Sequence, residues 1–132
     1  MKYLLDTHIW IWSVSQPEKL SEKVKNILDD DTNELFISSI SFWEFLILLE
    51  KGRITITKPT NEWLRDAIRD PNIKEIAVDK TIAIKSREID LPHQDPADRF
   101  IAASAFTHQL TLITSDSKLA KSRKISILFN SN

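Results

Sequence analysis

Short apolar runs alternate along the chain with longer segments in which apolar residues recur at helical spacing. The short runs have the length and aliphatic composition of buried strands, and they occupy residues 2–6, 35–38, 73–78, 111–114 and 125–129. The longer segments have the period of helices, and they occupy residues 7–14, 21–28, 40–51, 60–70, 80–89, 95–109 and 115–122. This alternation predicts an α/β fold, a three-layer α/β/α sandwich with a mostly parallel central sheet.

The segment 40–51 is the most apolar of the predicted helices. Its residues are apolar nearly all round, which is typical of a helix buried on every side. Either Ser39 or Ser41 is expected to cap its start, and Gly52 follows its end. Glu44 interrupts the apolar run, and an unpaired carboxylate in such a helix is costly. Either a metal ion or a buried salt bridge is therefore expected to compensate Glu44.

Length and composition are those of one globular domain covering residues 1–132. The single glycine excludes the glycine-rich phosphate loops of Walker and dinucleotide-binding enzymes. The absence of cysteine excludes disulfides and thiolate metal sites. Residues 1–10 form a poor signal peptide, and the longest apolar run, 45–49, is too short to span a membrane. We therefore expect a cytoplasmic protein with no membrane segment.

Two aspartates come directly after predicted strands. Asp6 ends the first strand, and Asp116 follows the strand at 111–114. Ligands of open parallel sheets bind at the carboxyl ends of the strands, so both aspartates are expected at the same functional edge. Each of them, taken singly, is equally well explained as the N-cap of the helix that follows.

A third pair of acids lies in "DPADRFIAASA". Asp95 precedes a proline at the first helical position, which is a well-formed helix start with Asp95 as the cap. Asp98 shares a helix face with Ile101, Ala102 and Ala105, and this face is expected to pack on the core. Capping explains Asp95, but it does not explain why Asp98 should point inward.

Four carboxylates from separated segments, those of Asp6, Glu44, Asp98 and Asp116, are thus expected to meet in one pocket. Like charges at close range raise one another's pKa unless cations compensate them. Oxygen ligands without cysteine favour Mg²⁺ or Mn²⁺ over Zn²⁺. Such ions activate a water and stabilise the leaving oxygen in phosphodiester hydrolysis, so this pattern predicts cleavage of a nucleic-acid backbone.

Four motifs in this order, "LLDTHIW", "ISSISFWEF", "DPADRFIAASA" and "LITSD", resemble those of PIN-domain ribonucleases, specifically VapC-type toxins of type II toxin–antitoxin pairs. The resemblance covers essentially the whole chain and implies a PIN-like fold with divalent-metal-dependent endoribonuclease activity. It implies that the metal ligands are Asp6, Glu44, Asp98 and Asp116, with Asp95 in a capping or supporting role. It also implies an RNA substrate, a cognate antitoxin protein and a homodimer.

Other residues near these motifs are expected to support the site. Thr7, Thr114 and Ser115 are candidates to hydrogen-bond a ligand carboxylate or a bound water. The candidate contacts to RNA phosphates are Lys51, Arg53, Arg99, Lys118 and Lys121, each of which is otherwise a solvated surface charge. His93 is a candidate to orient the acidic turn or the substrate, and His8 is expected to be structural. The four tryptophans either stack on bases or fill a core or subunit interface.

Two functions of other classes remain open. A receiver-like phospho-aspartate signalling module has a similar length and βα alternation. Such modules carry adjacent acids after the first strand and a lysine after the fifth, whereas this chain has a lone Asp6 and no lysine in that place. The second alternative is a catalytically inactive PIN-like domain that binds RNA or protein.

Overall fold

The computed structural model describes residues 1–92 and 94–131. Its strands are β1 (Lys2–Leu5), β2 (Glu34–Ser38), β3 (Ile73–Ile76), β4 (Thr111–Thr114) and β5 (Ser126–Phe129). Its helices are α1 (Thr7–Ser15), the short 3-10 helix η1 (Pro17–Lys19), α2 (Glu22–Asp29), α3 (Ser39–Glu50), α4 (Thr60–Ile68), α5 (Lys80–Glu88), α6 (Pro96–His108) and α7 (Ser117–Ala120). The predicted alternation of strands and helices is confirmed.

The five strands form one sheet in the order β3-β2-β1-β4-β5, and every neighbouring pair is parallel. The chain builds the sheet outward from β1 through β2 to β3, and then returns to the other side of β1 with β4 and β5. The strand order therefore reverses between β1 and β4. Connections leave the sheet in opposite directions at such a switch point, so a crevice for ligands opens at the carboxyl ends of these strands.

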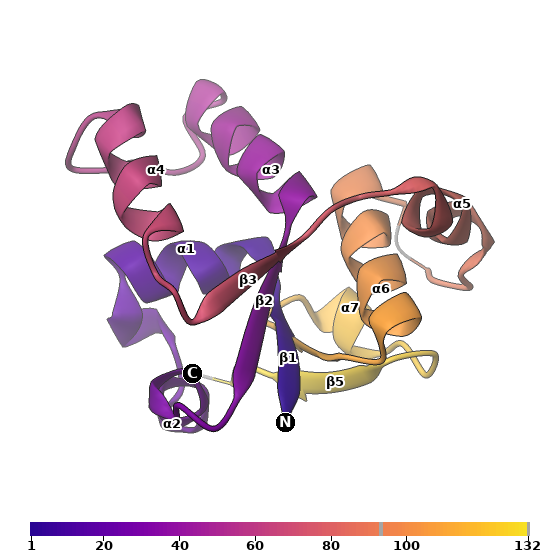
Figure 1. Cartoon of the computed structure of the whole chain (residues 1–132). Coiled ribbons are helices and arrows are strands. Elements are labelled where there is room, and N and C mark those ends of the chain that lie inside the picture. Colours follow the sequence, from indigo (N-terminus) through magenta and orange to yellow (C-terminus); the bar gives the residue numbers. More distant parts are fainter. Residues whose placement is uncertain (93, 132) are drawn as a thin grey trace.

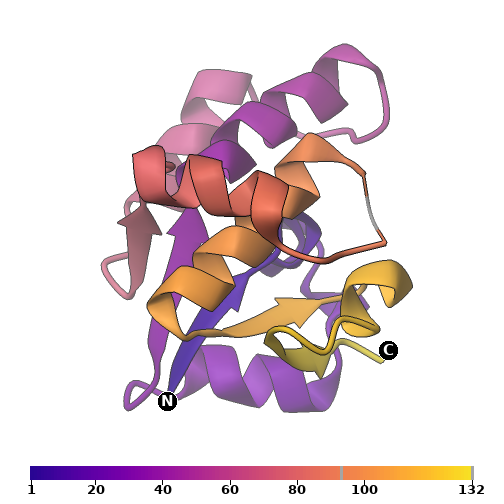
Figure 2. The ribbon, with the colours of Figure 1, turned by 90° about the vertical axis from the view of Figure 1, so that its right-hand side faces the viewer.

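Helices cover both faces of the sheet. In Figure 1, α1, α2 and α4 lie on one side and α5, α6 and α7 on the other, and Figure 2 shows the second helical layer from its own side. Leu5 of β1 belongs to the core on the first side, together with Trp10 and Trp63, whereas its neighbour Leu4 packs with Leu112 on the second side. Successive residues of a strand point to opposite faces, so the strands supply both cores and the predicted three layers are confirmed.

Two predictions about α3 are wrong in detail. Its cap is Ser38, the last residue of β2, whose Oγ accepts a 3.2 Å hydrogen bond from the Ile40 N–H. The helix starts there because β2 passes directly into it, with no connecting loop. It is also not buried on every side, because its Phe45 faces the core while Trp43 and Leu46 are 51% and 39% exposed.

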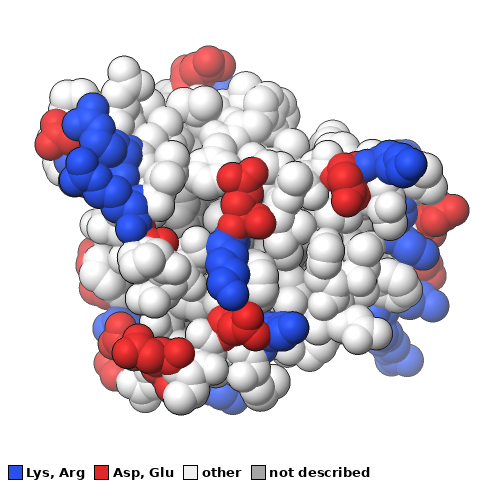
Figure 3. All heavy atoms as spheres, in the orientation of Figure 1, with Lys and Arg blue, Asp and Glu red and all other residues white. Residues whose placement is uncertain are grey.

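Charges of both signs are interspersed on the face shown in Figure 3. Glu34 of β2 pairs with cations of both neighbouring strands, because its carboxylate lies 3.9 Å from the Lys2 ammonium and 3.2 Å from that of Lys74. Among the residues described, no helix has both the length and the apolar character needed to cross a bilayer.

Candidate metal centre

Asp6 and Asp116 lie at the carboxyl ends of two adjacent strands. Asp6 follows β1 and caps α1, accepting a 2.9 Å hydrogen bond from the Thr7 N–H. Asp116 caps α7 and accepts from two of its N–H groups at 2.8 and 3.2 Å. Thr114 joins the two aspartates, because its hydroxyl donates to Asp6 Oδ2 at 2.6 Å and accepts from the Asp116 N–H at 3.0 Å. Both aspartates therefore act as caps and also stand at the edge where a ligand would bind.

A second buried hydrogen bond connects α1 with α3. The hydroxyls of Thr7 and Ser41 are 2.8 Å apart, and Ser41 lies three residues before Glu44, about one helical turn. This bond fixes the start of α1, and with it Asp6, relative to the turn of α3 that carries Glu44. The Thr7 hydroxyl thus bonds a residue of α3, and it is the Thr7 backbone that bonds a carboxylate.

Glu44, Asp95 and Asp98 form a cluster in which one carboxylate oxygen from each residue lies within 4.8 Å of the others. Asp95 also caps α6, with its Oδ1 accepting from the N–H groups of Ala97 at 2.9 Å and Asp98 at 3.4 Å. The predicted capping role of Asp95 is confirmed. The same residue also contributes a carboxylate oxygen to the cluster with Glu44 and Asp98.

A pocket of about 460 Å³ joins the strand-end aspartates to this cluster. The acids in its wall are Asp6, Glu44, Asp95, Asp98 and Asp116, and they are accompanied by His8, Trp12, Leu48, Arg53 and Ser115. The structure therefore brings all four carboxylates predicted to converge into one site. The pocket opens at the carboxyl edge of β1 and β4, where the strand order reverses.

The carboxylates of this pocket perturb one another. Burial raises the pKa of Asp6, while hydrogen bonds from the Thr114 hydroxyl and the Thr7 N–H act in the opposite direction. Burial, followed by the negative charges of the other four acids of the pocket, raises the pKa of Asp98 to about 8. Burial and the neighbouring negative charges thus both favour the protonated form of Asp98.

This donor set fits a hard divalent cation. The clustered atoms of Glu44, Asp95 and Asp98 are all carboxylate oxygens, the ligands that Mg²⁺ and Mn²⁺ prefer. A bound cation would also oppose the rise in the pKa of Asp98, because a nearby positive charge stabilises the ionised carboxylate.

The model of the PIN domain family matches residues 3–125. This chain belongs to the PIN-domain family. Ribonuclease VapC22 of Mycobacterium tuberculosis is 30% identical to it over 123 residues, which cover 91% of each chain. The predicted family resemblance is confirmed, and the receiver-like alternative is not favoured.

Solved toxin–antitoxin complexes contain the same PIN fold. VapBC2 from Rickettsia felis, bound to a DNA fragment from its promoter, matches with a TM-score of 0.72 at 19% identity over 98% of each chain. DNA-bound VapBC from Salmonella typhimurium matches with a TM-score of 0.68 at 19% identity, again over 98% of each chain. At this level of identity the likeness concerns the fold, and it confirms the predicted PIN-like α/β sandwich.

Ser115 of the PIN domain is held in the pocket wall by a residue that sequence reasoning missed. Its Oγ accepts a 2.9 Å hydrogen bond from Asn130 Nδ2, which also donates to the Lys19 carbonyl at 3.1 Å. The Oδ1 of the buried Asn130 accepts from the Ser21 N–H at 2.7 Å. Asn130 follows β5 and lies beyond the residues that the family model matches. The one available signal was a polar residue directly after the last strand.

The predicted phosphate contacts occupy different environments. Arg53 lines the acidic pocket. Lys51, at the end of α3, and Lys118 and Lys121, on and just after α7, are exposed and lie outside the described lining of the pocket. Arg53 is therefore the candidate that the structure places beside the acids.

The prediction that Arg99 contacts phosphate is wrong. Arg99 is 5% exposed, and its guanidinium donates to the carbonyls of Ser86 at 2.8 Å, Ile89 at 2.7 Å and Leu91 at 3.5 Å. These carbonyls lie at and beyond the last turn of α5, where carbonyls lack partners within the helix. Arg99 supplies the missing donors and so joins α6 to the end of α5.

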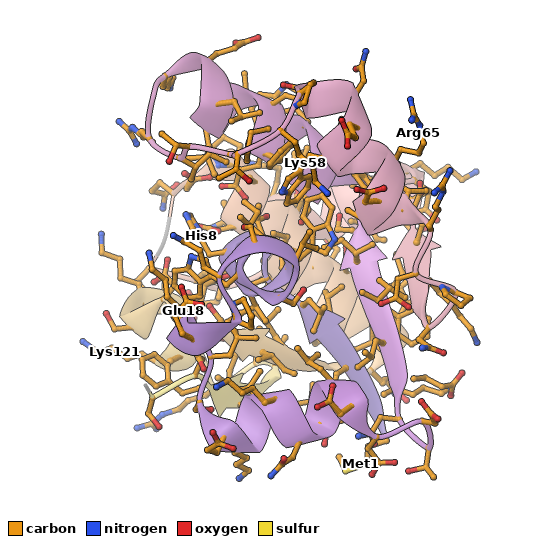
Figure 4. All side chains as sticks on the ribbon, turned by 90° about the vertical axis from the view of Figure 1, so that its left-hand side faces the viewer. Met1, His8, Glu18, Lys58, Arg65 and Lys121 are labelled. Carbon is orange, nitrogen blue, oxygen red and sulfur yellow. The ribbon has the colours of Figure 1, made fainter. Side chains whose placement is uncertain are left out.

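Two rings of α1 complete the pocket wall. His8 and Trp12 both line it, with their ring centroids 5.7 Å apart, and Figure 4 shows His8 on the side of the molecule where α1 is seen end-on. Trp10 and Trp63 are core residues, so of these three tryptophans only Trp12 reaches the pocket. The role predicted for His93 lies outside the described residues.

Proposed function

We propose that this PIN domain is a Mg²⁺- or Mn²⁺-dependent endoribonuclease, the toxin of a type II toxin–antitoxin pair. The observation that carries this proposal is the meeting of separated acids in one pocket at the switch point of a parallel sheet. The similarity to Ribonuclease VapC22 supports RNA as the substrate. Residues 1–132 act as one domain, since β1 pairs with both β2 and β4 and so holds the two halves of the chain in one sheet.

The acids have distinct parts in this proposal. Glu44, Asp98 and Asp95 hold the cation with their clustered oxygens, and Asp6 and Asp116 hold it from the ends of β1 and β4, directly or through water. When bound, the cation activates a water for attack on the phosphodiester and stabilises the charge on the leaving oxygen. The chain's own hydroxyls orient the acids and the wall, as Thr114 does for Asp6.

RNA carries a negative charge at every phosphate, so an acidic pocket needs positive groups beside it. Arg53 lies in the pocket wall and is proposed to contact the phosphate that is cleaved. Lys51, Lys118 and Lys121 are exposed and are proposed to contact phosphates farther along the strand.

The proposed protein partners are a cognate antitoxin and a second copy of this chain. The antitoxin is supported by the fold that this chain shares with toxin–antitoxin complexes. The homodimer is supported by the exposed apolar side chains of Trp43 and Leu46 on α3, because large exposed apolar groups tend to mark interaction surfaces. An RNA-cleaving toxin of this kind acts in the cytoplasm.

Cleavage of RNA by the antitoxin-free protein tests this function directly. We expect cleavage of single-stranded RNA with Mg²⁺ or Mn²⁺ and none with EDTA. Asp98→Asn should abolish cleavage, whereas Glu50→Gln, at the exposed end of the helix that carries Glu44, should retain it. Full cleavage by a folded Asp98→Asn variant would contradict the site. A wild-type protein inactive with both metals would point to the inactive PIN-like domain instead.

A further inference from the structure

A second pocket adjoins the acidic one. Its volume is about 440 Å³, within the range of roughly 300–1,000 Å³ typical of small-molecule sites. Trp12 and Ser115 belong to the walls of both pockets. A strand with one phosphate in the acidic pocket therefore has its next group close to the second pocket. We call this second site the Trp12–Phe129 pocket, after the two aromatic residues in its wall.

The two aromatic residues come from separate elements, Trp12 from α1 and Phe129 from the end of β5. Phe129 is 43% exposed, and it shares the pocket wall with the ring of Trp12. Proteins that bind single-stranded RNA present exposed aromatic rings of this kind, on which bases stack. The pocket therefore has the chemistry of a base-binding surface.

The wall of the pocket carries one cation, Lys19, beside one acid, Glu18. The Lys19 ammonium lies 5.4 Å from the centroid of the Trp12 ring, and Lys19 itself lines the pocket. The Lys19 ammonium can therefore make a cation–π contact with Trp12 and also attract a nearby phosphate. Figure 4 shows Glu18, the neighbour of Lys19 in the pocket wall, on the same side of the molecule as His8 of the acidic pocket.

The frame of the pocket is fixed by Asn130. Its side chain bonds the Ser21 N–H, the Lys19 carbonyl and the Ser115 hydroxyl. These bonds hold η1, the end of β5 and the loop after β4 in one arrangement. A site built on such a frame is formed before the ligand arrives, which reduces the entropy lost on binding.

We propose that the Trp12–Phe129 pocket binds one nucleobase of the RNA strand whose cleaved phosphate lies in the acidic pocket. The proposal rests on the proposed ribonuclease function. It is carried by the walls that the two pockets share and by the exposed ring of Phe129. Every base has an aromatic face, so the pocket selects an unpaired, splayed-out nucleotide rather than a particular base.

Photocrosslinking tests the pocket without requiring cleavage. Single-stranded RNA that carries 5-iodouridine at one position forms crosslinks to neighbouring aromatic side chains on irradiation, and peptide mass spectrometry locates them. We expect a crosslink at Phe129 or Trp12 for one position of the iodouridine. Crosslinks confined to other aromatic residues, such as the exposed Trp43, or no crosslink at all, would overturn the proposal. A crosslink at Phe129 without any cleavage would retain the pocket and reject the nuclease function.

Cleavage kinetics provide the second test. In wild-type protein, an abasic ribose at one position beside the cleaved bond should lower kcat/KM about tenfold, the size of one lost base–aromatic stack. Phe129→Ala and Phe129→Leu should lower kcat/KM for the intact RNA by a similar factor, and they should no longer respond to the abasic position. Phe106→Ala is the matched control, because Phe106 is also 43% exposed and lies on α6, with its ring beside Lys85.

The Phe106→Ala variant should cleave intact RNA at the wild-type rate and keep the full abasic penalty. A flat response of wild-type protein to the abasic series would overturn the proposal. So would a Phe129→Ala variant that keeps the penalty, or one that loses only its inhibition by antitoxin, since the pocket would then receive a peptide.

Discussion

The Thr114 hydroxyl donates a 2.6 Å hydrogen bond to Asp6 Oδ2 across 108 positions of the sequence. The Thr114 hydroxyl oxygen also accepts a 3.0 Å hydrogen bond from the Asp116 N–H. Thr114 and Asp6 are both buried, so losing either bond leaves a buried polar group without this partner. One threonine therefore sets the positions of both strand-end aspartates of the pocket.

Replacing Thr114 with valine should weaken both folding and cleavage. Thr114→Val leaves a buried carboxylate oxygen and a backbone N–H without this partner, a loss of about 1–3 kcal/mol in the free energy of unfolding. Urea unfolding and RNA cleavage measure the two effects. Thr114→Ser should stay close to wild type. Thr111→Val is the control, because the Thr111 hydroxyl bonds Ser126 in an exposed position of the same strand. An equal loss of stability and cleavage in the Thr111 and Thr114 variants would show that the buried hydrogen bond to Asp6 contributes no more than the exposed bond of Thr111.

Neutralising one acid of the cluster should stabilise the metal-free protein while removing its function. Asp98→Asn removes a carboxylate whose ionised form is disfavoured by burial and by repulsion from the neighbouring acids, so its free energy of unfolding in EDTA near pH 8 should rise by on the order of 1 kcal/mol. Its affinity for Mn²⁺ should fall at least about tenfold, because a ligand oxygen is lost. Thermal unfolding and metal titration measure the two quantities. Glu50→Gln, on the same helix as Glu44, should change neither. If Asp98→Asn were less stable than wild type in EDTA, repulsion among the acids of the pocket would not destabilise the metal-free protein.

The raised pKa of Asp98 predicts how the stability of the metal-free protein changes with pH. The ordinary value is 3.8 and the folded value is about 8, so between these limits the folded metal-free protein holds a proton that the unfolded chain has released. Stability without metal should therefore fall as the pH rises from about 4 to about 8. Cation binding must displace this proton, so affinity should rise over the same range. Unfolding in EDTA at several pH values and calorimetric metal titration in two buffers test this. Stability that rises with pH, or metal binding without proton release, would contradict it.

Much of the site could be predicted because its signals are local. Asp6 follows an apolar strand, and Asp98 shares a helical face with alanines that prove to be buried. Strand direction and helical period place such side chains before any tertiary contact is known. Glu44 was also predictable, because a charge inside an apolar helix needs compensation.

The remaining features depend on contacts between distant segments. Trp10 and Trp12 are two positions apart on α1, so the helical period sends their rings to opposite sides, and the packing of α1 decides which ring meets the core and which the pocket. Asn130 acts on residues about 110 positions away. Arg99 carries a charge that is typical of a surface, and its burial follows from carbonyls at the end of another helix. Sequence pattern alone does not determine such pairings.

Arg99 and Arg53 should respond in opposite ways to removal of their charge. Arg99→Met leaves buried carbonyls of the α5–α6 connection without donors, so it should lower the free energy of unfolding by roughly 2–4 kcal/mol. Arg53→Met changes an exposed residue and should alter stability by less than about 0.5 kcal/mol. RNA affinity should fall in Arg53→Met because a cation is lost beside the pocket. Urea unfolding and RNA binding at fixed salt concentration separate the two arginines. An Arg53 variant with wild-type affinity would exclude its phosphate role.

Asn130 should affect cleavage beyond its effect on folding. Asn130→Asp keeps the acceptor for the Ser21 N–H but removes the donor to the Lys19 carbonyl and to Ser115 Oγ. We expect a loss of about 1–3 kcal/mol in stability and, for the fraction that is folded, a clear fall in kcat/KM for RNA with metal affinity near wild type.

Asn33→Asp is the matched control. Asn33 Nδ2 also donates to a backbone carbonyl, that of Ile27 at 3.1 Å, but Asn33 precedes β2 and so lies at the opposite edge of the sheet from the acids. Its variant should lose stability alone, and an equal fall in kcat/KM in both variants would reduce Asn130 to a purely structural residue.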